Sequence, residues 1–588
     1  MLLSNLNLLA TAPDGVVKLR ELILTLAVQG KLLPQDPSDE PASVLLKKIR
    51  AEKDRLIAEG KIKRDKPLAE IAEEERPFEL PTGWEWVSLG DIGLVGSSSR
   101  VHQSDWKSYG VPFYRAREIV KLSRDGSVAN ELFISEELFA SLSQSGWVPE
   151  KNDIMITGVG TIGIPYIVKA SDRFYFKDAS VLIFKNYGNI NAEYLSLFLK
   201  SPLWIDRIHA DSMGTTVDTL TIARANIALV SLPPVAEQSR IVTRVEELMR
   251  LCDALSDKAR LEATQHAQLV ATLLGTLTAA SGAGAPDASA PTPGEPADPL
   301  HARWQRVAPH FDLLLDRPEA VDALEQTILQ LAVRGLLVPQ DPQNEPASAL
   351  LKKIRAEKDK LIAEGKIKRD KPLPPIAEDE KPFDLPKGWE WVRLGEIVVI
   401  SSGVTLGRKT TIPSPISLPY LRVANVQRWH LNLSSMKEVV IDKSELDRFQ
   451  LVSGDLLITE GGDWDKVGRT TIWRDELPIC GHQNHVFKAR GTSAQWNPVW
   501  AEMYLNSAVA RAYFASSAKQ TTNLASINMT QLKDCAFPLP PLAEQSRIVA
   551  RVASLRALCA DLRQLLTASR STQAHLAEAL VDLTTTRP

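Results

Sequence analysis

The stretch "LPPVAEQSRIVTRVEELMRLCDAL" occupies residues 232–255, and "LPPLAEQSRIVARVASLRALCADL" repeats it at residues 539–562. Apolar residues recur in both copies at alternating spacings of four and three. In the first copy they are Ile241, Val245, Leu248, Cys252 and Leu255. This heptad pattern predicts a helix with one face buried in a coiled coil. Each Pro-Pro pair favours a helix start, because proline cannot continue the preceding strand.

A second repeat lies earlier in each half. The segment "LLKKIRAEKDRLIAEGKIKRDKPL" at residues 45–68 returns at residues 350–373 with a single change, from Arg55 to Lys360. Its apolar residues follow helical spacing and its charged residues fall between them, which predicts an amphipathic helix. The wider match joins residues 19–92 to residues 324–397. The sequence therefore consists of two halves with the same order of parts.

The 588 residues exceed what one hydrophobic core usually serves, so several domains are expected. Between the repeated blocks lie stretches that agree only faintly, here called the first and second modules. An Ala/Pro/Gly-rich stretch without apolar periodicity predicts a flexible linker. The expected order is a helical block at 1–80, the first module at 81–235, a spacer helix at 236–278, the linker at 279–299, a second helical block at 300–385, the second module at 386–541 and a second spacer helix at 542–588.

Short β-rich runs punctuate the two modules. They include "DIMIT" (153–157), "SVLIF" (180–184), "DLLIT" (455–459) and "HVFKA" (485–489). Glycines and short polar loops separate these runs, which predicts an irregular sheet with a few helices. The expected fold class is therefore α/β (α+β), in two pseudo-repeated halves.

Composition excludes several classes of protein. With 44% hydrophobic and 24% charged residues, the chain resembles an ordinary globular protein. It has neither an apolar run long enough for a membrane span nor a signal peptide, and its four dispersed cysteines suit a reducing cytoplasm. A formal net charge of −3 does not indicate a general nucleic-acid binder, so any DNA contact requires local patches or a basic partner.

Motifs for catalysis are weak. "GVGTIG" (158–163) has no surrounding βαβ unit, and in "GGDWDKVGRT" (461–470) the glycine spacing is wrong for a phosphate loop and Arg469 replaces its lysine. No Asn/Asp-Pro-Pro-aromatic loop of an amino-methyltransferase is found. The histidines of "GHQNH" (481–485) are more typical of polar surface than of a metal site. We therefore expect no enzyme activity, no cofactor and no metal.

Two motifs carry a resemblance to a known family. "LPPxAEQSRIV" before a heptad helix and "LPxGWEWVxLGxI" at the start of each module occur twice and in the same order. The chain in this respect resembles the DNA-specificity subunit of type I restriction-modification systems, over residues 19–278 and 324–580. The resemblance implies two target recognition domains, each recognising one half of a bipartite double-stranded DNA site, with the long helices paired as an antiparallel coiled coil.

The same resemblance implies partners. The repeated helices would dock two methyltransferase subunits, and restriction and translocase subunits would join them, so that catalysis resides in these partners. Identical partners require equivalent surfaces, which agrees with the duplication. Two other hypotheses stay open: a self-sufficient methyltransferase or nuclease, which the missing motifs disfavour, and a scaffold whose two modules bind protein.

Candidate DNA-contacting residues follow from matching the two modules. Arg115 aligns with Arg422, and Glu118 aligns with Asn425; arginine suits guanine or phosphate, and asparagine suits adenine. Glycine-containing loops allow close approach of backbone to phosphate. The candidates in the first module are Arg115, Arg117, Thr157, Gly158, Gly160, Thr161, Lys177, Thr215 and Thr216. Those in the second are Arg422, Asn425, Gly461, Gly462, Trp464, Lys466, Arg469, His482, Gln483, Asn484, His485, Lys519, Gln520, Thr521 and Thr522. For each residue taken alone, a structural turn or exposed loop is an equal alternative.

Overall fold

The computed structural model divides the chain into two compact units. Unit 1 holds residues 1–262 and 570–588, and unit 2 holds residues 263–569. The structure describes residues 6–62, 68–144, 147–188, 190–210, 219–278, 299–407, 412–462, 466–520 and 525–586. Apart from Pro299, the predicted linker at 279–299 lies outside these residues. No helix within the described ranges has the length and apolarity that crossing a membrane requires.

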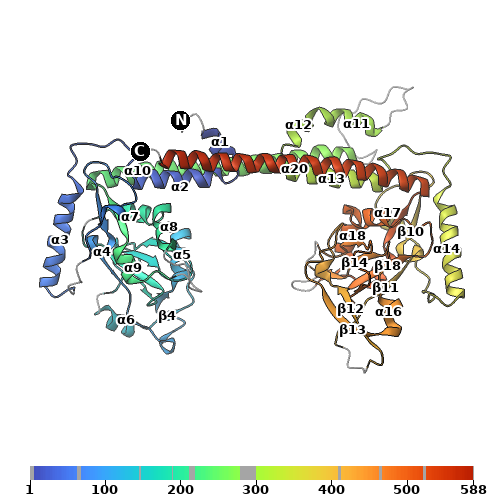
Figure 1. The fold of residues 1–588 in the computed structure, drawn as a ribbon, viewed down its shortest axis with the longest axis horizontal. Coiled ribbons are helices and arrows are strands. Elements are labelled where there is room, and N and C mark those ends of the chain that lie inside the picture. The colour runs from blue at the N-terminus through green and yellow to red at the C-terminus, as the bar shows by residue number, and fades with distance from the viewer. Residues whose placement is uncertain are drawn as a thin grey trace. The chain divides into compact units, whose positions relative to one another are not determined.

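Unit 1 contains the first helical block and the first module (Figure 1). Its helices are α1 (Leu6–Thr11), α2 (Gly15–Val28), α3 (Ala42–Ala58), α4 (Leu89–Ile92), α5 (Ala116–Asp125), α6 (Glu136–Ser143), α7 (Ala192–Phe198), α8 (Pro202–Ala210), α9 (Ile222–Ile227) and the first part of α10 (Val235–Thr278). Its strands are β1 (Glu85–Ser88), β2 (Leu94–Gly96), β3 (Val111–Tyr114), β4 (Phe133–Ile134), β5 (Ile154–Thr157), β6 (Pro165–Ile167), β7 (Tyr175–Phe176), β8 (Val181–Lys185) and β9 (Leu229–Leu232).

Unit 2 repeats this order. Its helices are α11 (Pro299–Val307), α12 (Phe311–Leu314), α13 (Pro318–Val333), α14 (Ala347–Ala363), α15 (Leu394–Ile397), α16 (Leu446–Phe449), α17 (Pro498–Leu505), α18 (Ala508–Ser517), α19 (Met529–Asp534) and the first part of α20 (Leu542–Thr586). Its strands are β10 (Glu390–Arg393), β11 (Val398–Ser402), β12 (Pro415–Leu421), β13 (Lys437–Asp442), β14 (Leu456–Thr459), β15 (Gly461–Gly462), β16 (Thr470–Ile472), β17 (Gly481–His482), β18 (Val486–Gly491), β19 (Lys519–Gln520), β20 (Ala525–Ser526) and β21 (Ala536–Leu539).

The two modules share one sheet topology. A four-stranded sheet has the order β2-β8-β5-β6 in unit 1 and β11-β18-β14-β16 in unit 2. A three-stranded sheet has the order β4-β3-β7 in unit 1 and β13-β12-β17 in unit 2. The expected runs at 153–157, 180–184, 455–459 and 485–489 correspond to the paired inner strands β5, β8, β14 and β18. Strands β5, β8 and β14 are buried along their length, and β18 is buried over its first four residues. Mixed helices and sheets in two repeated halves confirm the predicted fold class.

The predicted heptad faces of the long helices are buried. In unit 1, Ile241, Val245 and Cys252 of α10 pack with Leu19 and Ile23 of α2. The same core receives Ala577 and Leu580 from the last turns of α20. Because the end of α20 lies with the beginning of α10, the two helices run antiparallel, as the sequence predicted.

Unit 2 buries its seam in the same way, with one difference. Ile548, Val552 and Cys559 of α20 pack with α13, as their counterparts in α10 pack with α2. The last turns of α10 join a separate core with α12 and α13 through Val270, Leu274 and Leu277. The sequence predicted that the long helices bury their seams on each other, but much of each seam is covered by a helix of its own half.

One buried hydrogen bond joins the beginning of each module to its long helix. In unit 1 the indole Nε1 of Trp84 donates to Glu237 at 2.9 Å, and in unit 2 Trp389 donates to Glu544 at 3.0 Å. These are the "GWEW" and "AEQ" residues of the repeated motifs. Alongside, β1 pairs antiparallel with β9, and β10 pairs with β21. The first and last strands of a module are thereby held at the start of a long helix.

We predict that Glu237→Gln makes the stability of the protein less sensitive to pH. Burial raises the pKa of Glu237 above its ordinary value, although the bond from Trp84 opposes the rise. A raised carboxyl pKa gives stability that is full below the unfolded value of about 4.3 and is lost as the pH rises through the folded value. Glutamine keeps an acceptor for Trp84 without the charge.

Urea unfolding of both proteins between pH 5 and 8 measures this effect. The stability of wild type relative to Glu237→Gln should fall as the pH rises. A difference that stays constant, or that grows in favour of wild type, contradicts the prediction.

Candidate nucleic-acid interface

In the first module, four segments named from the sequence meet at one edge of the sheets. The backbone N–H of Lys177 donates to the carbonyl of Tyr114 at 2.8 Å, which places Lys177 next to Arg115. The N–H of Gly158 donates to Ser180 at 2.9 Å, and that of Leu220 donates to the carbonyl of Gly158 at 2.8 Å. Backbone bonds between chain-distant segments therefore build one surface.

The second module makes the matching bonds. The N–H of Gln483 donates to the carbonyl of Leu421 at 2.8 Å, next to Arg422. The N–H of Glu460 donates to His485 at 3.0 Å, and Ile527 donates to the carbonyl of Glu460 at 2.9 Å. In a small sheet of order β15-β20-β19, Ser526 of the middle strand pairs with Gly461 on one side and with Lys519 on the other. Matched segments of the two modules are therefore joined by matching backbone bonds.

A buried threonine closes the loop after the central strand in each module. Thr157 Oγ1 donates to the carbonyl of Thr161 and accepts from the N–H of Ile164. Thr459 Oγ1 donates to the carbonyl of Lys466 at 3.0 Å and accepts from the N–H of Arg469 at 3.0 Å. Both side chains are fully buried, so the candidate Thr157 fixes the loop shape, whereas Gly160 and Thr161 lie exposed at its tip.

Arg115 and Arg117 are held by acidic neighbours. Arg115 donates to both oxygens of Glu118, at 2.9 and 3.1 Å, and Arg117 donates to Glu118 and to Glu131. Burial acts to raise the pKa of Glu118, but the hydrogen bonds from the two arginines outweigh it and lower that pKa overall. Lys177 is exposed on the same edge.

Asn425 is used inside the second module. Only 3% of it is exposed. Its Oδ1 accepts from the N–H of Arg422 at 2.9 Å, and its Nδ2 donates to the carbonyls of Asn432 and Ser435 at 2.8 and 3.2 Å. Glu118 occupies the matching position and likewise accepts from the N–H of Arg115, at 3.0 Å. The structure therefore gives Asn425 a role in holding the turn, not an adenine-facing position.

His482 is also internal. It is fully buried in β17, with Nδ1 donating to the carbonyl of Val486 at 2.6 Å. Burial lowers its pKa to about 3, so the ring is neutral at physiological pH. Its neighbours Gln483 and Asn484 are half-buried, and His485 is exposed and contacts Glu460. The sequence predicted that residues 482–485 form one contact surface. In the structure the first of them, His482, lies in the core.

Other candidates lie around this edge. Gly461, Gly462 and Lys466 are half-buried, and Lys519 is exposed. Arg469 donates to the side chain of Gln427 at 2.7 Å, which brings into the surface a residue that the sequence gave no reason to select. The only available signal was its position, five residues after the Arg422 turn. The remaining candidates, Thr215, Thr216, Trp464, Thr521, Thr522 and the side chain of Gln520, lie outside the described residues.

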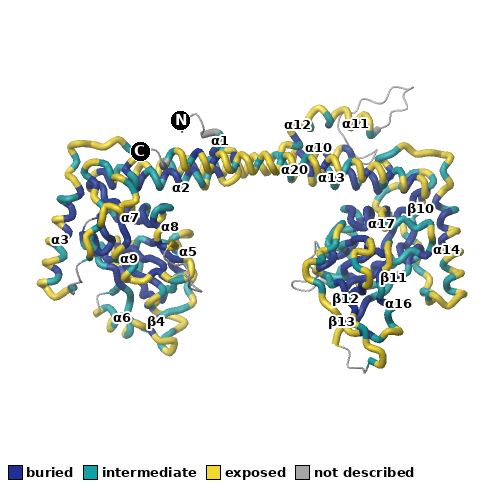
Figure 2. Tube along the Cα trace, in the orientation of Figure 1, coloured by how far each residue is buried: buried dark blue, intermediate teal, exposed yellow. Residues whose placement is uncertain are grey.

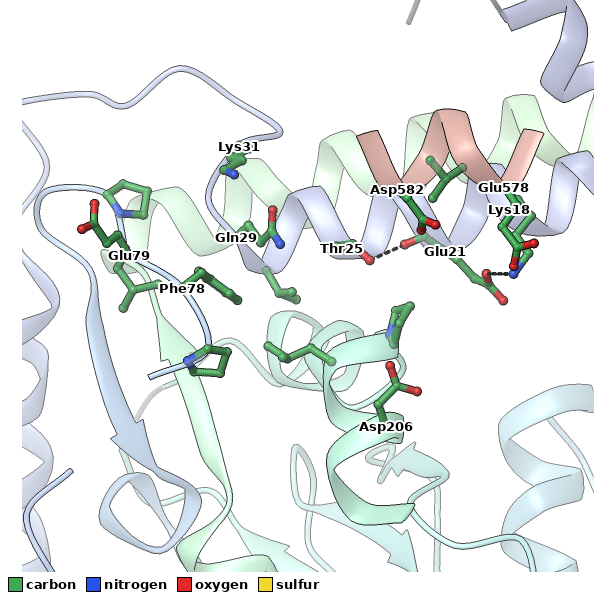
Figure 3. A pocket seen from close by; sticks show the side chains of 17 residues that line it. Lys18, Glu21, Thr25, Gln29, Lys31, Phe78, Glu79, Asp206, Glu578 and Asp582 are labelled. Atoms are coloured by element: carbon green, nitrogen blue, oxygen red, sulfur yellow. Dashed lines mark hydrogen bonds and ion pairs between the residues drawn. The ribbon is translucent and has the colours of Figure 1, made fainter. Parts of the chain in front are cut away.

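A pocket of about 930 Å3 lies elsewhere, between α2, α8, the loop before β1 and the last turns of α20 in unit 1 (Figure 3). Two lysines face five carboxylates there. The lysines are Lys18 and Lys31, and the carboxylates are Glu21, Glu79, Asp206, Glu578 and Asp582. An excess of carboxylates repels phosphate, so this pocket is not part of the nucleic-acid interface.

The comparison with known proteins identifies the family. A family model described as the type I restriction modification DNA specificity domain matches residues 81–265 and again residues 386–568. The chain belongs to this family. Each match begins shortly before Trp84 or Trp389 and ends within a long helix, so it covers one module with the first part of the helix that follows it.

Specificity subunits align with the chain over nearly its whole length. The type I restriction enzyme EcoAI specificity subunit of Escherichia coli is 36% identical, and the alignment covers 97% of this chain and 93% of that protein. The EcoEI specificity subunit of the same species is 34% identical over the same shares. A chain from a solved type I R-M system is 20% identical, with a TM-score of 0.46 over 86% of this chain and 98% of that one.

Membership establishes the broad function. The chain is a specificity subunit of a type I restriction-modification system, and it recognises DNA. This favours the DNA-recognition hypothesis over a scaffold whose modules bind only protein.

We predict that Asn425→Ala destabilises the protein before it affects any DNA contact. The change removes the partner of the N–H of Arg422 and of the carbonyl of Asn432, whereas the carbonyl of Ser435 keeps its bond from the Arg422 side chain. The loss should cost about 1–3 kcal/mol. Asn425→Asp keeps the acceptor but sets a carboxylate against the carbonyls of Asn432 and Ser435, and should cost at least as much.

Urea unfolding followed by tryptophan fluorescence gives the comparison. Gln483→Ala, on the same edge but half-buried, is the matched control and should lie within about 0.5 kcal/mol of wild type. Equal stability of Asn425→Ala and wild type contradicts the internal role.

Proposed function

We propose that each module recognises one half of a bipartite double-stranded DNA site and that the repeated helices dock two methyltransferase subunits. Restriction and translocase subunits join this assembly, which acts on DNA in the cytoplasm. The chain supplies recognition, and its partners supply methyl transfer and cleavage.

One observation carries the recognition part. The same backbone bond, 2.8 Å long in both modules, presents Lys177 in the first and Gln483 in the second. A common framework thus holds different side chains at the same point. Lysine is a phosphate ligand without sequence preference, whereas a glutamine amide can pair with the edge of adenine. Two modules of this kind recognise two different half-sites.

The contacts that we assign follow from exposure. In the first module, Gly160, Thr161 and Lys177 are exposed, with Arg115 and Arg117 beside them. In the second module, the corresponding set is the exposed His485 and Lys519 together with the half-buried Gln483, Asn484 and Lys466. The buried Thr157, Asn425 and His482 shape the surface from below.

The charges at the candidate interface support the proposal that DNA binding by the subunit depends on its partner subunits. Arg115 and Arg117 are paired with Glu118 and Glu131, so these two arginines contribute little net positive charge for phosphate. Neutralising phosphates supplies most non-specific affinity. With a net charge of −3, the subunit alone should bind random DNA weakly, and its methyltransferase partners should supply the missing electrostatic attraction.

The docking part rests on exposed leucines that recur in the repeat. Leu251 of α10 and its counterpart Leu558 of α20 are 60% and 62% exposed. Leu269 and its counterpart Leu576 are 50% and 53% exposed. Unit 1 carries Leu251 and Leu576, and unit 2 carries Leu558 and Leu269. Each unit therefore offers the same pair of apolar side chains, as two copies of one partner require.

We predict opposite signatures for two substitutions in the second module. Gln483→Ala should weaken binding of the specific site by about 1–3 kcal/mol and leave non-specific binding intact, because an amide contributes through a base. Lys519→Ala should weaken binding to all DNA sequences alike. It should also reduce the salt dependence of binding by the contribution of about one phosphate contact.

Fluorescence anisotropy with specific and random duplexes, across a salt series and in the presence of methyltransferase subunits, resolves the two. The control is Lys443→Ala, which alters an exposed lysine near the beginning of β12, at the end away from Leu421. It should change neither specific nor non-specific DNA binding. Loss of random-sequence binding in Gln483→Ala contradicts the assignment of that residue.

The division of labour has its own test. Purified subunit incubated with methyl donor and DNA should incorporate no methyl groups, and addition of methyltransferase subunits should start incorporation. Turnover by the subunit alone contradicts the proposal.

A further inference from the structure

Helices α3 and α14 carry the same residues on their solvent-exposed faces, coloured as exposed in Figure 2. In α3 the exposed residues include Lys47, Lys48, Arg50, Ala51, Asp54, Arg55 and Ala58. Their counterparts in α14 are Lys352, Lys353, Arg355, Ala356, Asp359, Lys360 and Ala363, all exposed. The only change is from Arg55 to Lys360, which keeps the charge.

Packing explains the other faces of these helices but not this one. Leu45, Ile49 and Leu56 of α3 are buried, and Leu350 and Ile354 of α14 are buried in the same way. The lysine at the edge of each buried face is also fixed: Lys53 donates to the carbonyl of Gly90 at 3.1 Å. Lys358 likewise donates to the carbonyl of Gly395, at 2.6 Å. Such contacts require particular residues, whereas solvent-exposed positions do not.

Duplication by itself does not preserve exposed residues in this chain. The long helices repeat the same heptad pattern, yet their exposed positions differ between copies. Thr243, Glu246 and Arg250 of α10 correspond to Ala550, Ala553 and Ala557 of α20. The exposed Val17 of α2 likewise corresponds to the exposed Asp322 of α13. The face shared by α3 and α14 has been kept where comparable faces have changed.

The chemistry of this face indicates a protein ligand. Lysines and arginines outnumber acids, so the partner surface is acidic. A phosphate-binding face requires only cations, whereas this one also keeps Asp54 and two alanines, which form one stripe with Lys47 at helical spacing. Lys48 is paired with Glu40 at 2.7 Å, and Lys353 with Glu345 at 2.7 Å. A fixed pattern of charge and small side chains fits one defined protein surface used twice.

We propose that the exposed faces of α3 and α14 are a duplicated docking surface, each receiving an acidic segment of one methyltransferase subunit. This rests on the proposed function, because it assumes two copies of one partner. Each partner would then contact two surfaces: the exposed leucines of the long helices, and the face of α3 or α14 in the helical block that precedes each module.

Charge reversal tests the surface one half at a time. Lys47→Glu/Lys48→Glu alters α3, and Lys352→Glu/Lys353→Glu alters α14. The lost ion pairs are exposed, so both proteins should fold, as thermal melting checks. Native mass spectrometry with methyltransferase subunits should show two bound copies on wild type, one on either variant, and none on the combined variant at the same concentrations. Titration should show affinity at the altered half weakened at least tenfold.

Two controls separate the causes. Lys437→Glu/Lys443→Glu reverses two exposed charges of the second module, away from both proposed docking surfaces, and should leave two copies bound. Ala58→Trp and Ala363→Trp block the same faces by bulk without changing charge, and should again remove one copy each.

The outcomes distinguish this inference from the function on which it rests. If wild type binds no methyltransferase subunit, the proposed docking function is wrong. If wild type and both charge variants bind two copies with equal affinity, the docking function stands and this inference is overturned. If the variants keep two copies but the subunit alone loses affinity for random DNA, the face binds phosphate and the inference is again overturned.

Discussion

A buried hydrogen bond from a tryptophan indole to a glutamate at the start of each long helix holds the parts of each half together. Trp84–Glu237 and Trp389–Glu544 connect the first strand of a module to the helix that follows its last strand. Burial raises the pKa of both glutamates, so each bond is kept at an electrostatic cost. The repeated "GWEW" and "AEQ" motifs are the sequence signature of this one contact, and they fix where a variable module can be attached.

A second constraint is that neither half completes its own core. The last turns of α20 supply Ala577 and Leu580 to unit 1, and the last turns of α10 supply Val270, Leu274 and Leu277 to unit 2. The ion pair between α2 and α10 has its charges reversed relative to the ion pair between α13 and α20. Arg20 bonds Asp253 in unit 1, whereas Glu325 bonds Arg556 in unit 2. Exchanging the partners would set like charges against each other, which favours each helix pairing within its own half.

The sequence predicted the elements well wherever periodicity alone decides them. The two long helices begin at Val235 and Leu542, within a residue of expectation, since a heptad face and a proline pair specify both period and start. It also predicted which segments of the two modules correspond, because the repeated flanks align matching strands and loops. It failed on single side chains. Asn425 and His482 are polar residues in polar loops, yet the pairing of β12 with β17 and the turn after Leu421 direct both inward. Which of several adjacent polar residues faces solvent depends on strand pairing between distant segments, and local composition does not encode it.

The central claim is that specificity lies in the modules and partner docking in the repeated helices. Replacing residues 90–230 with residues 397–537 gives a subunit with two copies of the second module on an unchanged helical framework. The direct measurement is sequencing of methylated bases in DNA from cells that express this chimaera with its methyltransferase subunits. The account predicts methylation at a new, near-palindromic bipartite site. Methylation at the original site would show that the helices determine specificity and would contradict the account.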